Sequence, residues 1–183
     1  MKIPIYQVDA FTNERFKGNP AAVCPLDNWL PAAVMQNIAA ENNLAETAFV
    51  VAAGENFEIR WFTPTVEVDL CGHATLASAY VLFNELGFAG DQINFISHRS
   101  GPLSVTKNGS ILALNFPVDS LTELPLKPAF AAGLSIGPRA VFKGKTDYLF
   151  VYDSEAEILA LQPDFVALKA HPVRGIIVTA PGE

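Results

Sequence analysis

One segment of this 183-residue chain constrains its fold more than any other. After Asp69, the next charged residue is Glu85, and the sequence between them is LCGHATLASAYVLFN. Residues 73–86 are predicted to form a helix that ends at Gly87, and this helix has no polar stripe. A helix that is apolar on all sides is buried on all sides. The neighbouring strands must therefore curve around it, which predicts a β-barrel wrapped around a central buried helix.

The segments around this helix have the alternation and the β-rich composition of strands. We expect strands over residues 3–11, 21–26, 47–53, 57–64, 92–97, 102–107 and 111–117, and a second helix over residues 30–43. Residues 1–116 are therefore predicted to form one α+β domain that carries the functional site.

The remainder of the chain is predicted to be a smaller unit. Residues 117–128 contain three prolines and little periodicity, which indicates a linker. Residues 129–183 contain candidate strands near 139–143, 147–152 and 174–180, and candidate helices at 154–161 and 163–170. The last helix and its strand, GIIVTAPGE, repeat the pattern of the earlier helix followed by TAFVVAAGE. We interpret residues 129–183 as a partial second half of the same type.

Composition excludes several classes of function. The net charge is −7, from 12 basic and 19 acidic residues, and the basic residues are scattered, so a nucleic-acid groove is not expected. The longest apolar run is shorter than a membrane span needs. The start of the chain has no signal-peptide pattern, and two cysteines are too few for a disulfide framework. These features predict a cytoplasmic protein.

The cluster at the head of the buried helix is the candidate site. The first-turn N–H groups of a helix lack partners inside it and lie at the positive end of the dipole, so they can bind an anion. Gly72 would let a ligand approach the backbone, and Cys71 and His73 flank it. A purely structural alternative also fits the residues: Asp69 caps the helix, Cys71 is a small buried side chain and His73 is hydrogen-bonded in the core. The residues alone leave both alternatives open.

Metal and cofactor chemistry are not expected from the sequence. The three histidines, His73, His98 and His171, are far apart and form no ligand pair. The chain contains no phosphate-binding loop and no dinucleotide fingerprint. A cysteine–histidine hydrolase would need an orienting residue that no spacing here indicates. We therefore predict no metal and no bound cofactor.

Three segments resemble one known family. FKGNPAAVCPL, NNLAETAFV and RWFTPTVEVDLCGHATLA occur in the order and form found in the phenazine-biosynthesis isomerase-like (PhzF-like) family, which is related to diaminopimelate epimerases and proline racemases. The resemblance covers residues 1 to about 116. It implies a diaminopimelate epimerase-like fold of two similar halves, each a barrel around a central helix, with the active site between them. In this chain the second half would be incomplete.

The resemblance also implies roles for individual residues. Glu46, in LAETAF, would be the catalytic acid/base of an isomerase or epimerase that moves a proton at carbon without a cofactor, in a biosynthetic process. Gly72 and His73 would bind a small carboxylate-bearing substrate. Related racemases use two opposed thiols, one from each half, whereas Cys24 lies in the same half as Cys71, so Cys71 is interpreted as a wall of the pocket. Asn19 would be either a residue beside the pocket or a turn former.

The family has a further motif in its second half that completes the substrate site, and this chain does not contain it. An alternative function follows from this difference: a catalytically inactive relative that acts as a small-molecule binding or assembly module. The incomplete second half also predicts a homo-oligomer, because unpaired strand edges and apolar faces associate.

Overall fold

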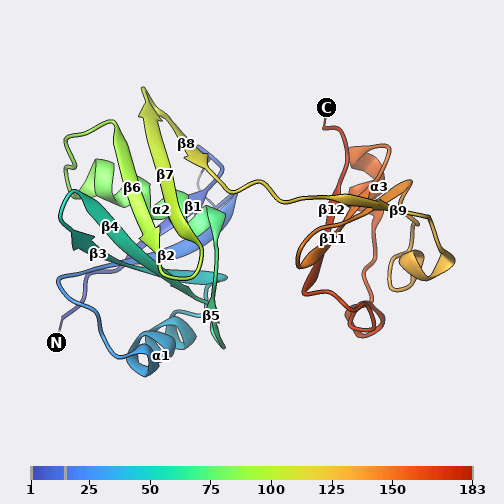
Figure 1. The fold of residues 1–183 in the computed structure, drawn as a ribbon, viewed down its shortest axis with the longest axis horizontal. Helices are drawn as coiled ribbons and strands as arrows, with labels where there is room; N and C mark the ends of the chain where they lie inside the picture. The colour runs from blue at the N-terminus through green and yellow to red at the C-terminus, as the bar shows by residue number, and fades with distance from the viewer. Residues whose placement is uncertain (1, 15, 183) are drawn as a thin grey trace. The chain divides into compact units, whose positions relative to one another are not determined.

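The computed structural model of the protein describes residues 2–14 and 16–182, and it divides into two compact units, Met1–Pro117 and Val118–Glu183 (Figure 1). The elements of the first unit are β1 (Tyr6–Ala10), β2 (Asn19–Leu26), α1 (Ala32–Asn42), β3 (Glu46–Ala53), β4 (Asn56–Phe62), β5 (Glu67–Val68), α2 (Gly72–Tyr80), a π-helical turn (Val81–Glu85), β6 (Gln92–Ser97), β7 (Gly101–Asn108) and β8 (Ile111–Asn115). The predicted elements of this part are all present, with ends shifted by a few residues.

The strands of the first unit form one curled sheet in the order β1-β2-β3-β4-β6-β7-β8, with the short β5 paired to β4. Two neighbouring pairs are parallel, β2 with β3 and β4 with β6, and the other pairs are antiparallel. Each parallel pair needs a crossover, and a helix supplies it in both cases: α1 joins β2 to β3, and α2 lies between β4 and β6.

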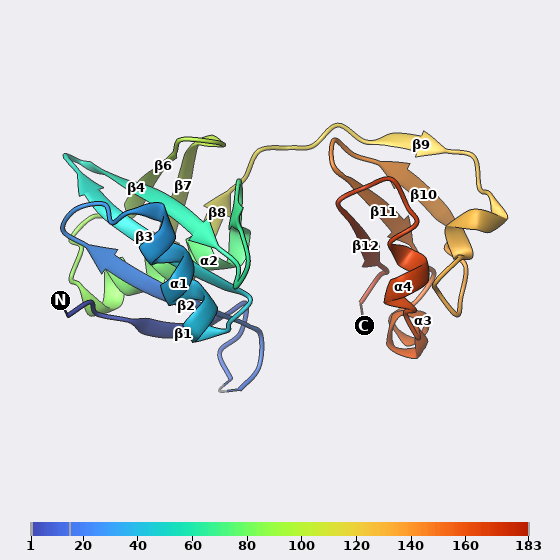
Figure 2. The same cartoon turned by 90° about the horizontal axis from the view of Figure 1, so that it is seen from below.

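The two helices cover opposite faces of the sheet, as the two views together show (Figures 1 and 2). In β2 and β3, Val23 and Val50 belong to the core around α2, whereas Cys24 and Phe49 pack in the core around α1. Burial on both faces explains why these strands are continuously apolar, AAVC and AFVV, rather than alternating. By contrast, β6 alternates between exposed and buried residues.

The central helix is shorter than predicted. We expected one helix over residues 73–86, but α2 ends at Tyr80 and a π-helical turn continues to Glu85. The side-chain amide of Asn84 donates to the Tyr80 carbonyl, an oxygen that an α-helix would pair with the Asn84 backbone N–H. The burial of α2 is as expected, since Ala74, Ala77 and Ala79 are at most 1% exposed.

The sheet curls around α2 but is not a closed barrel. In the described part of the chain no pairing joins the edge strands β1 and β8. Along this seam Leu76, Ala77 and Tyr80 line an open cavity of about 1000 Å³, together with residues of β1 and β8. Tyr80 is 43% exposed there. The predicted wrapping of the helix is therefore confirmed on every side except this seam.

The second unit has its own sheet and core. Its elements are β9 (Thr122–Leu124), a 3₁₀ turn (Pro128–Ala131), β10 (Ala140–Lys143), β11 (Asp147–Val151), α3 (Glu155–Ala160), α4 (Phe165–Leu168) and β12 (Gly175–Thr179). The strand order is β12-β11-β10-β9, and β11 and β12 are parallel. Like β2 and β3, this parallel pair is joined through helices. The core contains Phe130, Val141, Tyr148, Phe150 and Tyr152.

The predicted linker, residues 117–128, is wrong in part. Thr122–Leu124 forms β9, which pairs with β10, and Leu124 packs against the core of the second unit. A three-residue strand is too short to show a period of two, so its sequence did not reveal it. The second unit therefore begins at Val118 rather than at residue 129.

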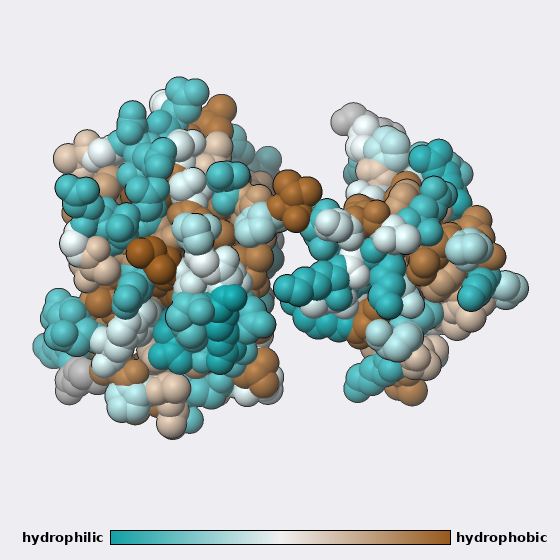
Figure 3. All heavy atoms as spheres, in the orientation of Figure 1, coloured by the Kyte–Doolittle hydropathy of each residue, from teal (hydrophilic) through white to brown (hydrophobic). Residues whose placement is uncertain are grey.

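Polar residues cover most of the face seen in Figure 3, and the apolar residues there appear in small groups. Among the described residues, no helix has both the length and the apolar character needed to cross a bilayer. The buried apolar residues thus form three clusters, which surround α2, α1 and Phe130.

A turn glycine gives a test of this fold. Gly18 has φ +77°, and a Cβ there would clash with the Ala10 carbonyl oxygen, whereas Gly54 has φ +65° and open space around it. We expect Gly54→Ala to lower the free energy of unfolding by about 1 kcal/mol through backbone strain alone. Gly18→Ala should cost about 2–4 kcal/mol because the clash adds to the strain.

Urea unfolding followed by tryptophan fluorescence would measure both effects, since Trp29 and Trp61 are the two tryptophans of the chain and both belong to the first unit. Equal losses for the two variants would contradict the close approach of Gly18 to β1.

Candidate functional site

Glu46 is held at the start of β3 by the end of α1. The helix ends at Asn42, and Asn43 takes a left-handed conformation with φ 50° while its N–H donates to the Ala39 carbonyl. The Asn42 side chain then donates to Thr47 Oγ at 3.1 Å, which ties the helix end to the strand. Glu46 is aligned with Ala21 of β2, and its side chain is 20% exposed.

The other part of the site is the start of α2. Cys71 is the N-cap residue in extended conformation, and its carbonyl accepts bonds from both the N–H and the hydroxyl of Thr75, at 3.2 and 2.6 Å. Gly72 and His73 form the first turn. The thiol of Cys71 meets no criterion for a capping hydrogen bond, although it lies near the backbone N–H groups of His73 and Ala74 in the first turn of α2.

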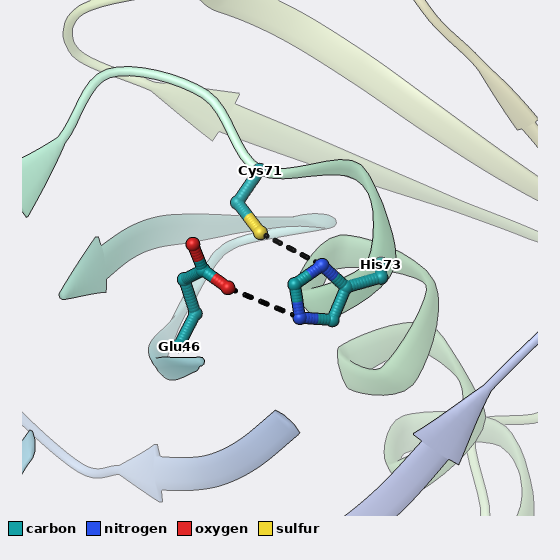
Figure 4. A group of neighbouring side chains, drawn as sticks. All are labelled: Glu46, Cys71 and His73. Carbon is teal, nitrogen blue, oxygen red and sulfur yellow. Dashed lines mark hydrogen bonds and ion pairs between the residues drawn. The ribbon is translucent and has the colours of Figure 1, made fainter. Parts of the chain in front are cut away.

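Three side chains from these two elements converge (Figure 4). His73 Nε2 lies 3.2 Å from Glu46 Oε2, and His73 Nδ1 lies 3.4 Å from Cys71 Sγ. One donor atom of each residue lies within 4.8 Å of the others. The two ring nitrogens of His73 therefore face different groups, Nε2 the carboxylate and Nδ1 the thiol.

Burial determines the protonation state of the two cysteine thiols. Cys71 is 6% exposed, and desolvation raises the pKa of its thiol to about 12, with the Glu46 carboxylate adding to the rise and backbone N–H groups opposing it. Desolvation also raises the pKa of Cys24 to about 12. Both thiols are thus protonated at neutral pH, and neither is disulfide-bonded.

Two further residues were predicted for the site, Gly72 and Asn19. Gly72 stands between Cys71 and His73 and is half-buried. Asn19 is the first residue of β2 and is aligned with Ala10 of β1. It lies two residues before Ala21, which is aligned with Glu46 of β3. The structure brings Glu46, Cys71 and His73 into direct proximity.

One part of the structural alternative is wrong. Asp69 does not cap α2: its carboxylate pairs with Arg99 at 3.0 Å, and its carbonyl accepts the Ser100 hydroxyl at 2.6 Å. Arg99 also pairs with Glu67, which in turn forms a two-bond contact with Arg60. This network anchors the segment that leads into Cys71.

The sequence analysis missed these supporting residues. Arg60, Glu67 and Arg99 are distant in the chain and carry no shared motif. Asn42 carries only a weak signal, because the pair Asn42-Asn43 at the end of the predicted helix 30–43 is typical of a helix end.

Comparison with known proteins shows the family of this chain. A family model described as phenazine biosynthesis-like protein matches residues 8–183. The chain belongs to the phenazine biosynthesis-like (PhzF-like) family. The match includes both units, so the second unit is part of the family's sequence rather than an unrelated addition.

Curated relatives of this PhzF-like chain are named as isomerases. An uncharacterized isomerase of Pseudomonas aeruginosa is 51% identical over 98% of this chain and 69% of its own length. A second one from the same organism is 49% identical over the whole chain and 69% of its own length. The chain therefore spans about two thirds of these relatives.

Solved structures show the same fold. The crystal structure of a PhzF-family phenazine biosynthesis protein of Enterococcus faecalis superposes with a TM-score of 0.91 at 50% identity, covering all of this chain and 70% of that one. A predicted epimerase of Pseudomonas aeruginosa, at 20% identity, superposes with a TM-score of 0.68 over 97% of this chain and 70% of that one, which shows the fold alone. The predicted α+β, epimerase-like fold is confirmed.

The buried thiol of Cys71 should make stability depend on pH. Its pKa is about 12 in the folded chain, against 9.0 as the ordinary value, so above pH 9 the unfolded chain binds fewer protons than the folded one. Stability must then fall as pH rises through this range. Between pH 8 and pH 10, we expect the wild type to lose about 1 kcal/mol more unfolding free energy than Cys71→Ser.

Urea titrations at the two pH values would measure the difference, with Cys24→Ser as a comparison because the pKa of that buried thiol is raised equally. The same pH slope in wild type and Cys71→Ser would show that the thiol is not desolvated.

Proposed function

We propose that this PhzF-like chain is a cofactor-independent isomerase that moves a proton between carbon atoms of a small carboxylate-bearing substrate. One observation carries the proposal: the Glu46 carboxylate approaches the first turn of the buried helix α2 and lies 3.2 Å from His73 Nε2. A proton acceptor and an anion-binding helix end are thus within reach of one small molecule.

The helix end supports the binding of a carboxylate. The backbone N–H groups of Gly72 and His73 are in the first turn of α2, where a helix offers them no internal partner. They lie at the positive end of the helix dipole, which favours an anion. The imidazole of His73, 8% exposed, provides a further polar contact beside them.

Glu46 would then act on the bound substrate. Its carboxylate takes a proton from a substrate carbon, and the electron pair left behind is delocalised into the adjacent unsaturated system. The same carboxylic acid returns the proton to a different carbon, so the substrate is isomerised and Glu46 is regenerated. No electrons or groups are exchanged with another reactant, and therefore the step needs no cofactor.

Cys71 and Asn19 have secondary roles in this proposal. A thiol with a pKa of about 12 is a poor base at neutral pH, which supports Cys71 as a wall of the pocket rather than as the acid/base. Asn19 would border the substrate from the start of β2. The isomerase names of the curated relatives favour an enzyme over the alternative of a binding module. A cytoplasmic location, based on cysteine content, is part of the same proposal.

Isotope exchange tests the chemistry. A panel of small carboxylic acids with an acidic C–H next to an unsaturated carbon would be incubated with the protein in D₂O. We expect deuterium at the exchanging carbon of the substrate, detected by NMR. Glu46→Gln should lower the rate by about 10²–10⁴-fold because an amide cannot accept the proton.

Two variants serve as controls for this experiment. Cys71→Ser should keep most of the activity if the thiol only lines the pocket, and Glu41→Gln, an exposed glutamate on α1, should behave as wild type. An active Glu46→Gln protein together with an inactive Cys71→Ser protein would reverse the assignment and place the chain with the thiol racemases.

We also propose that the chain self-associates through the second unit. Leu159, Phe165, Val166 and Ile177 on α3, α4 and β12 are 78%, 71%, 81% and 52% exposed, which is unusual for large apolar side chains. Light scattering over a concentration series should detect a homo-oligomer that Phe165→Ser/Val166→Ser weakens. Val66→Ser, a matched exposed residue of the first unit, should have no effect. A monomer at all concentrations would refute association.

A further inference from the structure

Glu46, Cys71 and His73 together offer one carboxylate oxygen, one sulfur and one ring nitrogen within 4.8 Å of one another. We propose that these three side chains form a binding site for a single divalent transition-metal ion of the zinc type. This revises the expectation of no metal site, which was based on the spacing of the histidines. The nearest donors to His73 in space are a glutamate and a cysteine, not another histidine.

The distance between the first two donors fits a zinc ion. Cys71 Sγ and His73 Nδ1 are 3.4 Å apart. Zinc binds cysteine sulfur at about 2.3 Å and histidine nitrogen at about 2.0–2.1 Å, so two such ligands in a tetrahedron are about 3.5 Å apart. The separation of these two donor atoms is therefore the one that a tetrahedral zinc ion requires.

Glu46 can supply the third ligand. Its carboxylate lies 3.2 Å from Nε2, on the same side of the imidazole as the Cys71 thiol (Figure 4), and it must turn toward Nδ1 to reach a zinc–oxygen distance of about 2.0–2.2 Å. The side chain has two flexible methylene groups and is 20% exposed, so this movement is open to it. Its exposure also leaves a path by which an ion and a water molecule can enter.

An unsatisfied polar atom points to a missing partner at the same place. His73 is more than nine-tenths buried, and its Nε2 has no hydrogen bond of acceptable geometry although the Glu46 carboxylate is near it. A buried ring nitrogen without a good partner costs free energy. An ion on Nδ1 would make Nε2 the protonated nitrogen of the ring, and this N–H would still need an acceptor such as a water molecule.

The donor set selects the class of metal. Thiolate and imidazole favour zinc, cobalt and related ions, whereas magnesium and calcium prefer sets made of oxygen alone. Binding exchanges one proton for the ion: the Cys71 S–H bond breaks, the S–metal bond forms, and the proton goes to solvent. No oxidation or reduction occurs.

The binding proposal is independent of the proposed isomerase function. If Glu46 is the acid/base of that isomerase, an ion bound to Glu46 would inhibit the reaction. This consequence rests on the proposed function. The test therefore measures binding directly, so that its failure is distinct from a failure to find a substrate.

Cobalt(II) is the probe, because a cobalt–thiolate bond gives a near-ultraviolet charge-transfer absorption. Untagged protein would be titrated with Co²⁺, then with Zn²⁺ to displace it. We expect one ion per chain, the thiolate band in the wild type, and its loss on addition of Zn²⁺ but not of Mg²⁺. Cys71→Ala should abolish the band.

Two further variants complete the design. Cys24→Ala is the matched control, since Cys24 is also buried and reduced, and it should keep the band. Glu46→Gln should keep the band but weaken binding by about tenfold or more, because an amide is a poorer ligand than a carboxylate. Glu46 is partly exposed, so this variant also gives a result if Cys71→Ala fails to fold.

A wild type without the band, a band that survives in Cys71→Ala, or a band lost in Cys24→Ala would each overturn the proposal. Unchanged affinity in Glu46→Gln would remove Glu46 from the ligand set and leave too few protein donors for a specific site.

Discussion

The burial of α2 is the constraint on which the first unit depends. A helix made of Ala74, Ala77 and Ala79 on its packed sides lets strands approach closely, and the sheet must curl to surround it. Its buried hydroxyls are satisfied within the helix: Thr75 bonds to the Cys71 carbonyl and Ser78 to the Ala74 carbonyl. The N–H groups of its first turn have no hydrogen-bond partner inside the helix, so this end of α2 is where a polar ligand can bind.

The sheet brings Glu46 to the start of α2 because the two crossover helices, α1 and α2, lie on opposite faces of the sheet. Strands β2 and β3 are parallel and covered by α1 on one side and α2 on the other. In such a double-sided layer the register is strongly set, since a slip by one residue would exchange Val50 and Phe49 between the two cores. The position of Glu46 at the start of β3 is therefore fixed by packing some distance from the site.

The sequence predicted the elements that have long, clear patterns. The apolar run from Ala74 to Phe83 predicted a buried central helix, and resemblance to the family predicted Glu46, Cys71, Gly72 and His73 as one group. The open seam between β1 and β8 was not predictable, because strand order is a long-range property that no local pattern records. The π-helical turn was missed since a single bond from Asn84 decides it. The approach of His73 to Glu46 depends on the curl of the whole sheet.

Burial of Glu46, Cys71 and His73 has opposite effects on the two proposals, proton transfer and metal binding. Desolvation keeps the Cys71 thiol protonated, which protects the sulfur from reaction and, in the proposed reaction, leaves proton transfer to the carboxylate of Glu46. A divalent ion changes this balance, because it brings into the site the positive charge that stabilises a thiolate. The ion must, however, displace a proton held with a pKa of about 12, and its net affinity is reduced accordingly. In the proposed reaction, a substrate carboxylate at the start of α2 would displace no such proton. Under the two proposals, the same three side chains would transfer protons when metal is scarce and bind metal when it is abundant.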